Sequence, residues 1–202
     1  MDSDQDVLDR WRAGDQAAGQ ELFSRYFRPL YRFFANKCSE PDELIQSTFL
    51  AIVKSKDQFA GRSSFRTYLF VIARNELYRH MRELKRSEAF DPEVSSIAQI
   101  VTSAGSRLVR NEEHRCLFGA LRTLSIDHQT LLEFHYWEHL DASALAEIFD
   151  VPAQAIRMRL SRARTALREA MAAGEGAPAA ALRSDDDLER WVRTVPAVAD
   201  KA

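Results

Sequence analysis

Apolar residues recur with the spacing of an α-helix throughout the first half of the chain. A ring-rich segment, residues 22–34, has apolar side chains at every third or fourth position. Residues 42–54 repeat this spacing with Ile45, Phe49 and Ile52, and residues 67–86 continue it. The period is typical of helices with one buried face, and no segment alternates apolar and polar residues as a surface strand does. We therefore expect an all-α first half.

Helical periodicity returns over residues 112–172 and ends in two helices joined by a tight turn. Asp141 is a favourable N-cap for a short helix over residues 141–149, and residues 150–152 (Asp-Val-Pro) form the turn. The second helix runs over residues 154–170 without a breaker. Its narrow apolar stripe consists of Ile156, Leu160, Ala163 and Leu167. This pattern predicts a helix-turn-helix.

Two segments without such periodicity divide the chain. Residues 87–111 contain Asp-Pro, Ser-Ser and Ser-Ala-Gly-Ser, and residues 173–202 begin with an Ala-, Gly- and Pro-rich stretch. The pattern predicts two small helical domains joined by a flexible linker. The expected bounds are an acidic N-terminal segment over 1–16, a first domain over 17–86, a linker over 87–111, a second domain over 112–172 and a flexible C-terminal extension over 173–202.

A short helix is expected within the C-terminal extension. Ser184 and Asp187 have the spacing of a capping box, and Leu188, Trp191, Val192 and Val195 would share one face of the helix that follows. We interpret this helix as a small regulatory element that docks on the protein or on a partner.

The composition narrows the class of protein. The longest purely apolar run is far shorter than the roughly 20 residues of a membrane span, and the acidic N-terminus is unlike a secretory signal. Cys38 and Cys116 lie far apart, without a metal or redox spacing, and are expected to be ordinary thiols in a reducing cytoplasm. We expect a cytoplasmic protein with no cofactor, no metal and no membrane insertion.

Positive charge is concentrated in two places, although the whole chain carries −2. Residues 17–86 hold thirteen basic and seven acidic side chains, a net +6. Residues 154–171 hold five arginines and one acid, a net +4, whereas residues 112–153 carry a net −6. A basic first domain indicates a polyanionic partner. Arginines on the second helix of a helix-turn-helix suit a recognition helix in the major groove, where guanidinium groups bind guanine edges and phosphates.

A polar loop over residues 57–66 leads into the basic helix over residues 67–86. It is flanked by Phe59 and Phe65, and arginines follow it. Basic groups beside aromatic rings are typical of single-stranded DNA binding. The residues alone are equally consistent with aromatics that face the core and arginines that face water.

Four stretches in register resemble the bacterial sigma factors of the extracytoplasmic-function (ECF) group. They are residues 22–33, 42–49, 65–75 and 155–164. The resemblance implies a region-two domain, a region-four domain and no large region between them. It also implies a function without catalysis: a sigma factor that binds core RNA polymerase and directs promoter recognition, DNA melting and transcription initiation at a subset of promoters.

The resemblance implies three sets of site residues. The set that docks on the polymerase is Glu43, Gln46, Ser47 and Leu50. The set that contacts the minus-ten element is Gly61, Arg62, Ser63, Ser64, Phe65, Arg66, Asn75 and Arg82, where the loop takes a flipped base. The set on the recognition helix that contacts the minus-thirty-five element is Arg157, Met158, Ser161, Arg162 and Arg164. The implied partners are core RNA polymerase, promoter DNA as duplex and melted strand, and an anti-sigma protein.

Two alternatives remain open. Ser47 replaces an acid that is usual in the family, and Arg79 replaces an Asp. These two departures support the first alternative, a helix-turn-helix regulator that no longer docks on polymerase. Residues 135–139 have the H-x-x-E-H spacing of a zinc hydrolase. A catalytic zinc site would need a third ligand from another element.

Overall fold

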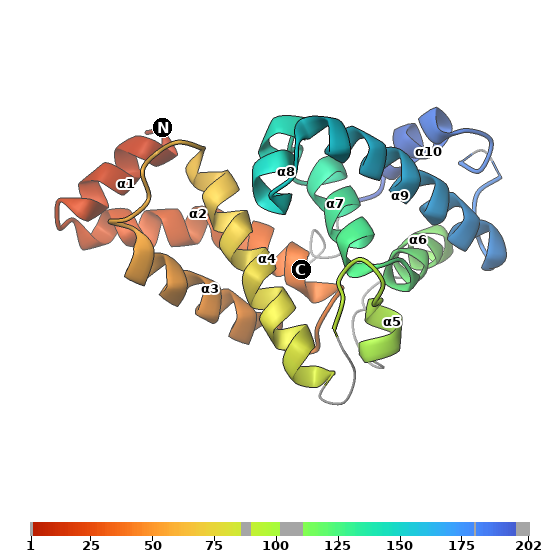
Figure 1. The fold of residues 1–202 in the computed structure, drawn as a ribbon, viewed down its shortest axis with the longest axis horizontal. Coiled ribbons are helices and arrows are strands. Elements are labelled where there is room, and N and C mark those ends of the chain that lie inside the picture. Colours follow the sequence, from red (N-terminus) through yellow and green to blue (C-terminus); the bar gives the residue numbers. More distant parts are fainter. Residues whose placement is uncertain (1, 86–89, 102–110, 180, 197–202) are drawn as a thin grey trace.

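The chain folds into two groups of helices that lie side by side (Figure 1). The computed structural model describes residues 2–85, 90–101, 111–179 and 181–196. Apart from one isolated β-bridge between Ser96 and Ser125, the regular elements in these ranges are helices, which confirms the predicted all-α fold. They are α1 (Asp4–Arg12), α2 (Gln16–Ala35), α3 (Pro41–Ser55), α4 (Phe65–Leu84), α5 (Ile97–Ile100), α6 (Glu112–Thr123), α7 (Ile126–Tyr136), α8 (Ala142–Phe149), α9 (Ala153–Ala173) and α10 (Asp185–Val192). We refer to α1–α4 as the first domain and to α6–α9 as the second domain.

Aromatic rings form the centre of the first domain. Phe23 of α2 stacks on Phe49 of α3 with ring centroids 4.3 Å apart, and Phe33 and Phe34 are buried. At the start of α4, Tyr68 stacks on Phe59 at 4.5 Å. Complete burial of one such ring stabilises the fold by about 1.5–3 kcal/mol, so these contacts fix how the three helices pack.

The acidic N-terminal segment forms a helix, which was not among the helices predicted from the sequence. Ser3 caps α1 and shares a reciprocal capping box with Asp6. Three apolar residues of α1, Val7, Leu8 and Trp11, are buried against the first domain. The segment is therefore part of the first domain, because its few apolar residues share one helical face.

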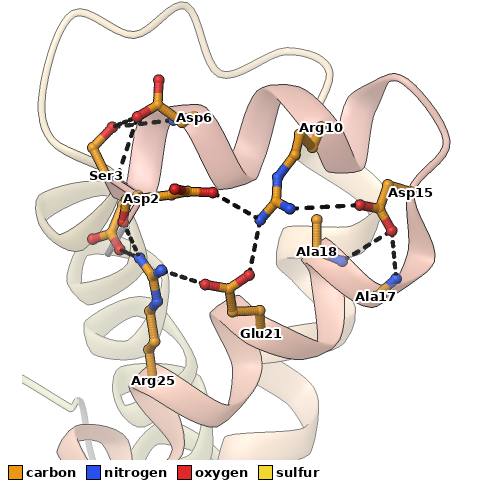
Figure 2. A network of polar contacts seen from close by, with 10 residues as sticks. Asp2, Ser3, Asp6, Arg10, Asp15, Ala17, Ala18, Glu21 and Arg25 are labelled. Carbon is orange, nitrogen blue, oxygen red and sulfur yellow. Dashed lines mark hydrogen bonds and ion pairs between the residues drawn. The ribbon is translucent and has the colours of Figure 1, made fainter.

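Figure 2 shows the polar contacts that orient α1 on α2. Arg10 lies 2.8 Å from Glu21 and 3.4 Å from Asp2, and Arg25 contacts both Asp4 and Glu21. Most of these groups are substantially exposed, so each pair contributes at most about 1 kcal/mol to stability. Their effect is to fix the angle between the two helices.

The second domain contains the predicted helix-turn-helix. The Asp141 side chain accepts hydrogen bonds from two backbone amides at the start of α8, and α9 begins directly after Pro152. Between the helices Asp150 adopts a left-handed conformation with φ of 53°, which an Asp tolerates better than a bulky residue. The stripe of Ile156, Leu160, Ala163 and Leu167 is buried, as expected from the helical periodicity.

Part of the predicted linker packs on the second domain. The backbone carbonyls of Pro92 and Ser95 accept hydrogen bonds from Asp127 and Ile126 at the start of α7. Ile97 of α5 is fully buried. This stretch carries too few residues to show a helical period, so its sequence resembles an unstructured connection.

The C-terminal extension returns to the second domain as α10. Ser184 caps the helix at the predicted position, and Leu188, Val192 and Val195 are buried. The indole N–H of Trp137 donates to the carbonyl of Val195 over 2.8 Å. The helix thus covers the end of α7 and one side of α9.

Candidate promoter and polymerase interfaces

The N-terminal half of α9 presents a polar, basic surface. Arg157, Ser161 and Arg162 are exposed, and the Met158 side chain is 50% exposed. These four residues lie opposite the buried stripe, so the helical period that buries the stripe also aims them at solvent. Guanidinium groups and a hydroxyl on one accessible helical face can donate to base edges and phosphates.

Arg164 lies differently from the other residues predicted to read the minus-thirty-five element. Its guanidinium lies 3.2 Å from the hydroxyl of Tyr136 in the same domain and 2.8 Å from Glu189 of α10. Only 21% of its side chain is exposed. The structure therefore separates Arg164 from the four exposed residues and gives it a role in holding α10.

The residues predicted for the minus-ten element fall into three environments. Gly61 and Arg62 are exposed in the loop before α4, where Gly61 has a φ of 68° that favours glycine. Ser63 is half-buried. Ser64 is the N-cap of α4, and its hydroxyl accepts from the backbone amide of Thr67 over 3.0 Å. The loop is therefore held in place by the cap of the helix that follows it.

Phe65 and Arg66 are less accessible to solvent than Gly61 and Arg62 of the loop. Phe65 is buried against Tyr26, with ring centroids 5.5 Å apart. The Arg66 guanidinium lies 2.5 Å from Glu138 of the second domain. Further along α4, Asn75 and Arg82 are exposed, and Arg82 lies over the ring of Phe90. Of the predicted set, the structure leaves Gly61, Arg62, Ser64, Asn75 and Arg82 exposed to a nucleic acid.

The predicted docking residues line one face of α3. Glu43 and Gln46 are exposed, Ser47 is half-buried and the Leu50 side chain is 52% exposed. They occur at spacings of three and four residues, which places them on one stripe of the helix.

An apolar groove lies between α3 and α2 beside these residues. The groove is open to solvent, and its walls include Phe27, Gln46, Leu50 and Val53. Phe27 and Val53 are 48% and 43% exposed, which is unusual for large apolar side chains. Neither was predicted from the sequence, although Gln46, Leu50 and Val53 lie at i, i+4 and i+7, the spacing of one helical face.

The H-x-x-E-H residues do not converge. Glu138 points into the interface with the first domain, where it contacts Arg32 and Arg66. His135 lies beside Arg164, 3.2 Å from its guanidinium, and burial lowers the pKa of its imidazole. Within the described ranges, no group of three His, Cys, Asp or Glu side chains is arranged to hold a metal ion. The same part of the chain holds no helix of the length and hydrophobicity that a membrane span requires.

Two parts of the chain match models of one protein family. Residues 22–87 match the model of Sigma-70 region 2, and residues 114–167 match the model of Sigma-70, region 4. The two matches fall on the first and second domains in the predicted order.

Relatives share both domains along most of their length. The chain is 26% identical over 173 residues to the ECF RNA polymerase sigma-E factor of Haemophilus influenzae, covering 80% of this chain and 92% of the relative. It is 23% identical over 183 residues to the RNA polymerase sigma-H factor of Pseudomonas aeruginosa, covering 85% and 95%.

Two solved structures share the fold. One is CnrH in complex with the cytosolic domain of CnrY, with a TM-score of 0.63, 21% identity and coverage of 86% of this chain and 100% of that one. The other is the sigma factor RpoE in complex with the anti-sigma factor NepR from Bartonella quintana, with a TM-score of 0.56, 22% identity and coverage of 78% and 97%. Together with the two matched regions, these similarities show that the chain belongs to the sigma-70 family of RNA polymerase sigma factors, in its ECF group.

Proposed function

We propose that this protein binds core RNA polymerase and directs it to a subset of promoters by contacting two promoter elements. The observation that carries the proposal is the apolar groove beside Gln46 and Leu50. A domain that leaves Phe27, Leu50 and Val53 accessible around one groove has the features of a protein-docking site. The part of the first domain that was predicted over residues 17–86 would hold the polymerase-docking and minus-ten functions.

The second domain, residues 112–172, would recognise the minus-thirty-five element as duplex. Its four exposed residues Arg157, Met158, Ser161 and Arg162 are the proposed contacts. Arg164 is left out of this set because its guanidinium is bound to Tyr136 and Glu189. The proposal places no catalysis on this chain.

The minus-ten element would contact the loop before α4 and the exposed residues of that helix. Gly61, Arg62, Ser63 and Ser64 supply polar and backbone groups for an unstacked base, while Asn75 and Arg82 are available to the strand further along. The cost of unstacking, a few kcal/mol, would be offset by these contacts and by the polymerase.

The protein would act where its polymerase is, in the cytoplasm. An anti-sigma protein is a further proposed partner, because the two solved structures of the same fold are complexes with CnrY and with the anti-sigma factor NepR.

Substitution in the groove tests the docking proposal. Leu50→Asp places a charge among apolar walls, so retention of the variant by immobilised core polymerase should fall at least tenfold. Leu84→Asp is the matched control, because Leu84 is 50% exposed at the end of α4, away from the groove. Retention of the control should equal that of the unchanged chain.

The same measurement addresses the regulator that does not dock on polymerase. That alternative predicts no retention of the unchanged chain, while binding to duplex DNA persists. Equal retention of Leu50→Asp and Leu84→Asp would contradict the groove as the docking surface.

A further inference from the structure

Four residues of α9 form a stripe along one side of the helix, which we call the basic stripe. They lie at i, i+4, i+7 and i+11 and are Arg157, Ser161, Arg164 and Arg168. Arg157 and Ser161, in the N-terminal half of the helix, are exposed, whereas Arg164 and Arg168 are partly buried. The two halves of the basic stripe therefore differ in what they can contact.

Two carboxylates of α10 bind the partly buried half of the basic stripe. Arg164 lies 2.8 Å from Glu189, and Arg168 donates to Asp185 over 2.5 Å. Asp185 and Glu189 are one helical turn apart, which places both acids on the side of α10 that faces α9. A carboxylate and a DNA phosphate offer a guanidinium group the same kind of acceptor, a pair of oxygens that share a negative charge. The acids of α10 thus bind these two arginines as a DNA backbone would.

Apolar contacts hold α10 in this position on α9. Leu188 and Val192 are fully buried, and the indole N–H of Trp137 donates to the carbonyl of Val195 over 2.8 Å. The ion pairs between α10 and α9 are partly open to solvent, so they contribute little to stability. Their larger effect is on the charge that α9 presents to a ligand.

Arg164 and Arg168 lie where a helix in the major groove would approach the DNA backbone. In a helix-turn-helix, the N-terminal residues of the recognition helix contact base edges. Arg168 lies 11 residues beyond Arg157, about 16 Å along the axis at about 1.5 Å per residue. This distance exceeds the groove width of about 12 Å. A helix that reads bases with Arg157 therefore carries Arg168 toward the flanking phosphates.

We propose that α10 is an acidic cover that occupies Arg164 and Arg168 in place of DNA phosphates and so limits the binding of duplex DNA by the free protein. This inference rests on the proposed function, in which α9 binds duplex DNA. The match to region 4 ends at residue 167, whereas α10 begins at Asp185, so the cover lies outside the matched region. Each phosphate contact releases counterions, so the cover should lower both the affinity for DNA of any sequence and the dependence of that affinity on salt.

Asp185→Asn together with Glu189→Gln in the full-length chain tests the proposal. These changes remove both negative charges and keep the apolar contacts of α10. Asp186→Asn together with Glu175→Gln is the matched control, because it removes the same total charge from two exposed acids. Fluorescence anisotropy measures the binding of a short labelled duplex of random sequence over a series of salt concentrations.

We expect the neutralised cover to release both arginines to phosphates. Affinity for the random duplex should rise about three- to thirtyfold near roughly 0.1 M salt, and the slope of log K against log salt should steepen by about 1–2. The control should bind within about twofold of the unchanged chain, with the same slope. Adding Arg164→Ala and Arg168→Ala to the neutralised chain should restore the original slope, because these changes remove the released contacts.

Leu188→Asn is a second variant, which displaces α10 as a whole. An amide is unfavourable at this fully buried position, so α10 should leave α9 and the salt slope should steepen in the same way. Circular dichroism and thermal unfolding check that the other helices of the variant remain folded.

The proposal is overturned if neutralising the cover leaves the salt slope unchanged, or if the control steepens it equally. It is also overturned if the two alanine substitutions fail to reverse the change, or if folded Leu188→Asn binds the random duplex no more tightly than the unchanged chain. Polymerase and promoter sequence are absent from these measurements. A chain that responds as expected but is not retained by core polymerase would therefore contradict the proposed function alone.

Discussion

Two arginines of α9 differ in their exposure to solvent, and we therefore expect a different role for each. Arg162 and Arg164 lie two positions apart on α9, which turns their side chains about 200° from each other. Arg162 is exposed on the surface proposed to bind DNA, whereas Arg164 bonds to Tyr136 and Glu189. The sequence predicted both as DNA contacts, because the acidic partner of Arg164 lies on a helix beyond the domain.

The two arginines should respond differently to substitution by alanine. Arg162→Ala should weaken binding to minus-thirty-five duplex by about 1–3 kcal/mol, or roughly 5- to 150-fold, with little change in the melting temperature. Arg164→Ala should lower the melting temperature and leave the affinity of the folded protein within about threefold, because it removes contacts to Tyr136 and α10. DNA binding by fluorescence anisotropy and thermal unfolding of each variant measure the two effects. The reverse pattern would contradict the assignment of Arg164.

At the scale of elements, repeats of an apolar stripe predicted the long helices, and the short helices α8 and α10 were predicted from their N-caps, Asp141 and Ser184. The long helices α2, α3, α4 and α9 contain several repeats of the apolar stripe, so their periodicity identifies them. The nine-residue α1 and the four-residue α5 contain too few repeats. Their formation depends on contacts with distant residues, such as that between Trp11 and α2, which no local pattern reveals.

Gly19 marks one such contact. A Cβ at this position of α2 would lie 2.7 Å from the indole of Trp11, so Gly19→Ala must displace the ring that holds α1. We expect the variant to lose about 1–3 kcal/mol of unfolding free energy, as overpacked sites do. Gly119→Ala is the control: it lies in α6 with nothing within 4 Å of the added Cβ and should be neutral or stabilising by up to about 1 kcal/mol. Denaturant unfolding compares them, and equal effects would contradict the packing of α1 on Gly19.

At the scale of the whole molecule, the sequence predicted two domains and their order but not their contact. The signal was present in the charges, since residues 17–86 carry +6 and residues 112–153 carry −6. The basic charge was assigned to DNA alone, whereas the structure pairs Arg32 and Arg66 with Glu138 of the acidic part. Charge totals show complementarity between segments, but only the fold shows which groups meet.

The exposure of a site residue could be predicted from the sequence only on helices, where the helical period determines which side chains face solvent. The outward stripe of α3 and the basic face of α9 follow from the buried stripes opposite them. The groove at Phe27 and the burial of Phe65 do not, because they depend on which neighbouring helix covers each ring. Within the minus-ten set, Phe65 and Arg66 are the first residues of α4, and their surroundings depend on Tyr26 and Glu138 rather than on the helical period.

The most direct test of the central claim is transcription in vitro by purified core polymerase on genomic fragments, with the start sites mapped. We predict discrete starts that depend on this protein, preceded by two shared elements, and loss of those starts when Leu50→Asp replaces the unchanged chain. Starts that are absent with the full-length protein, although it still binds duplex DNA, would contradict its assignment as a promoter-directing subunit and favour a helix-turn-helix regulator.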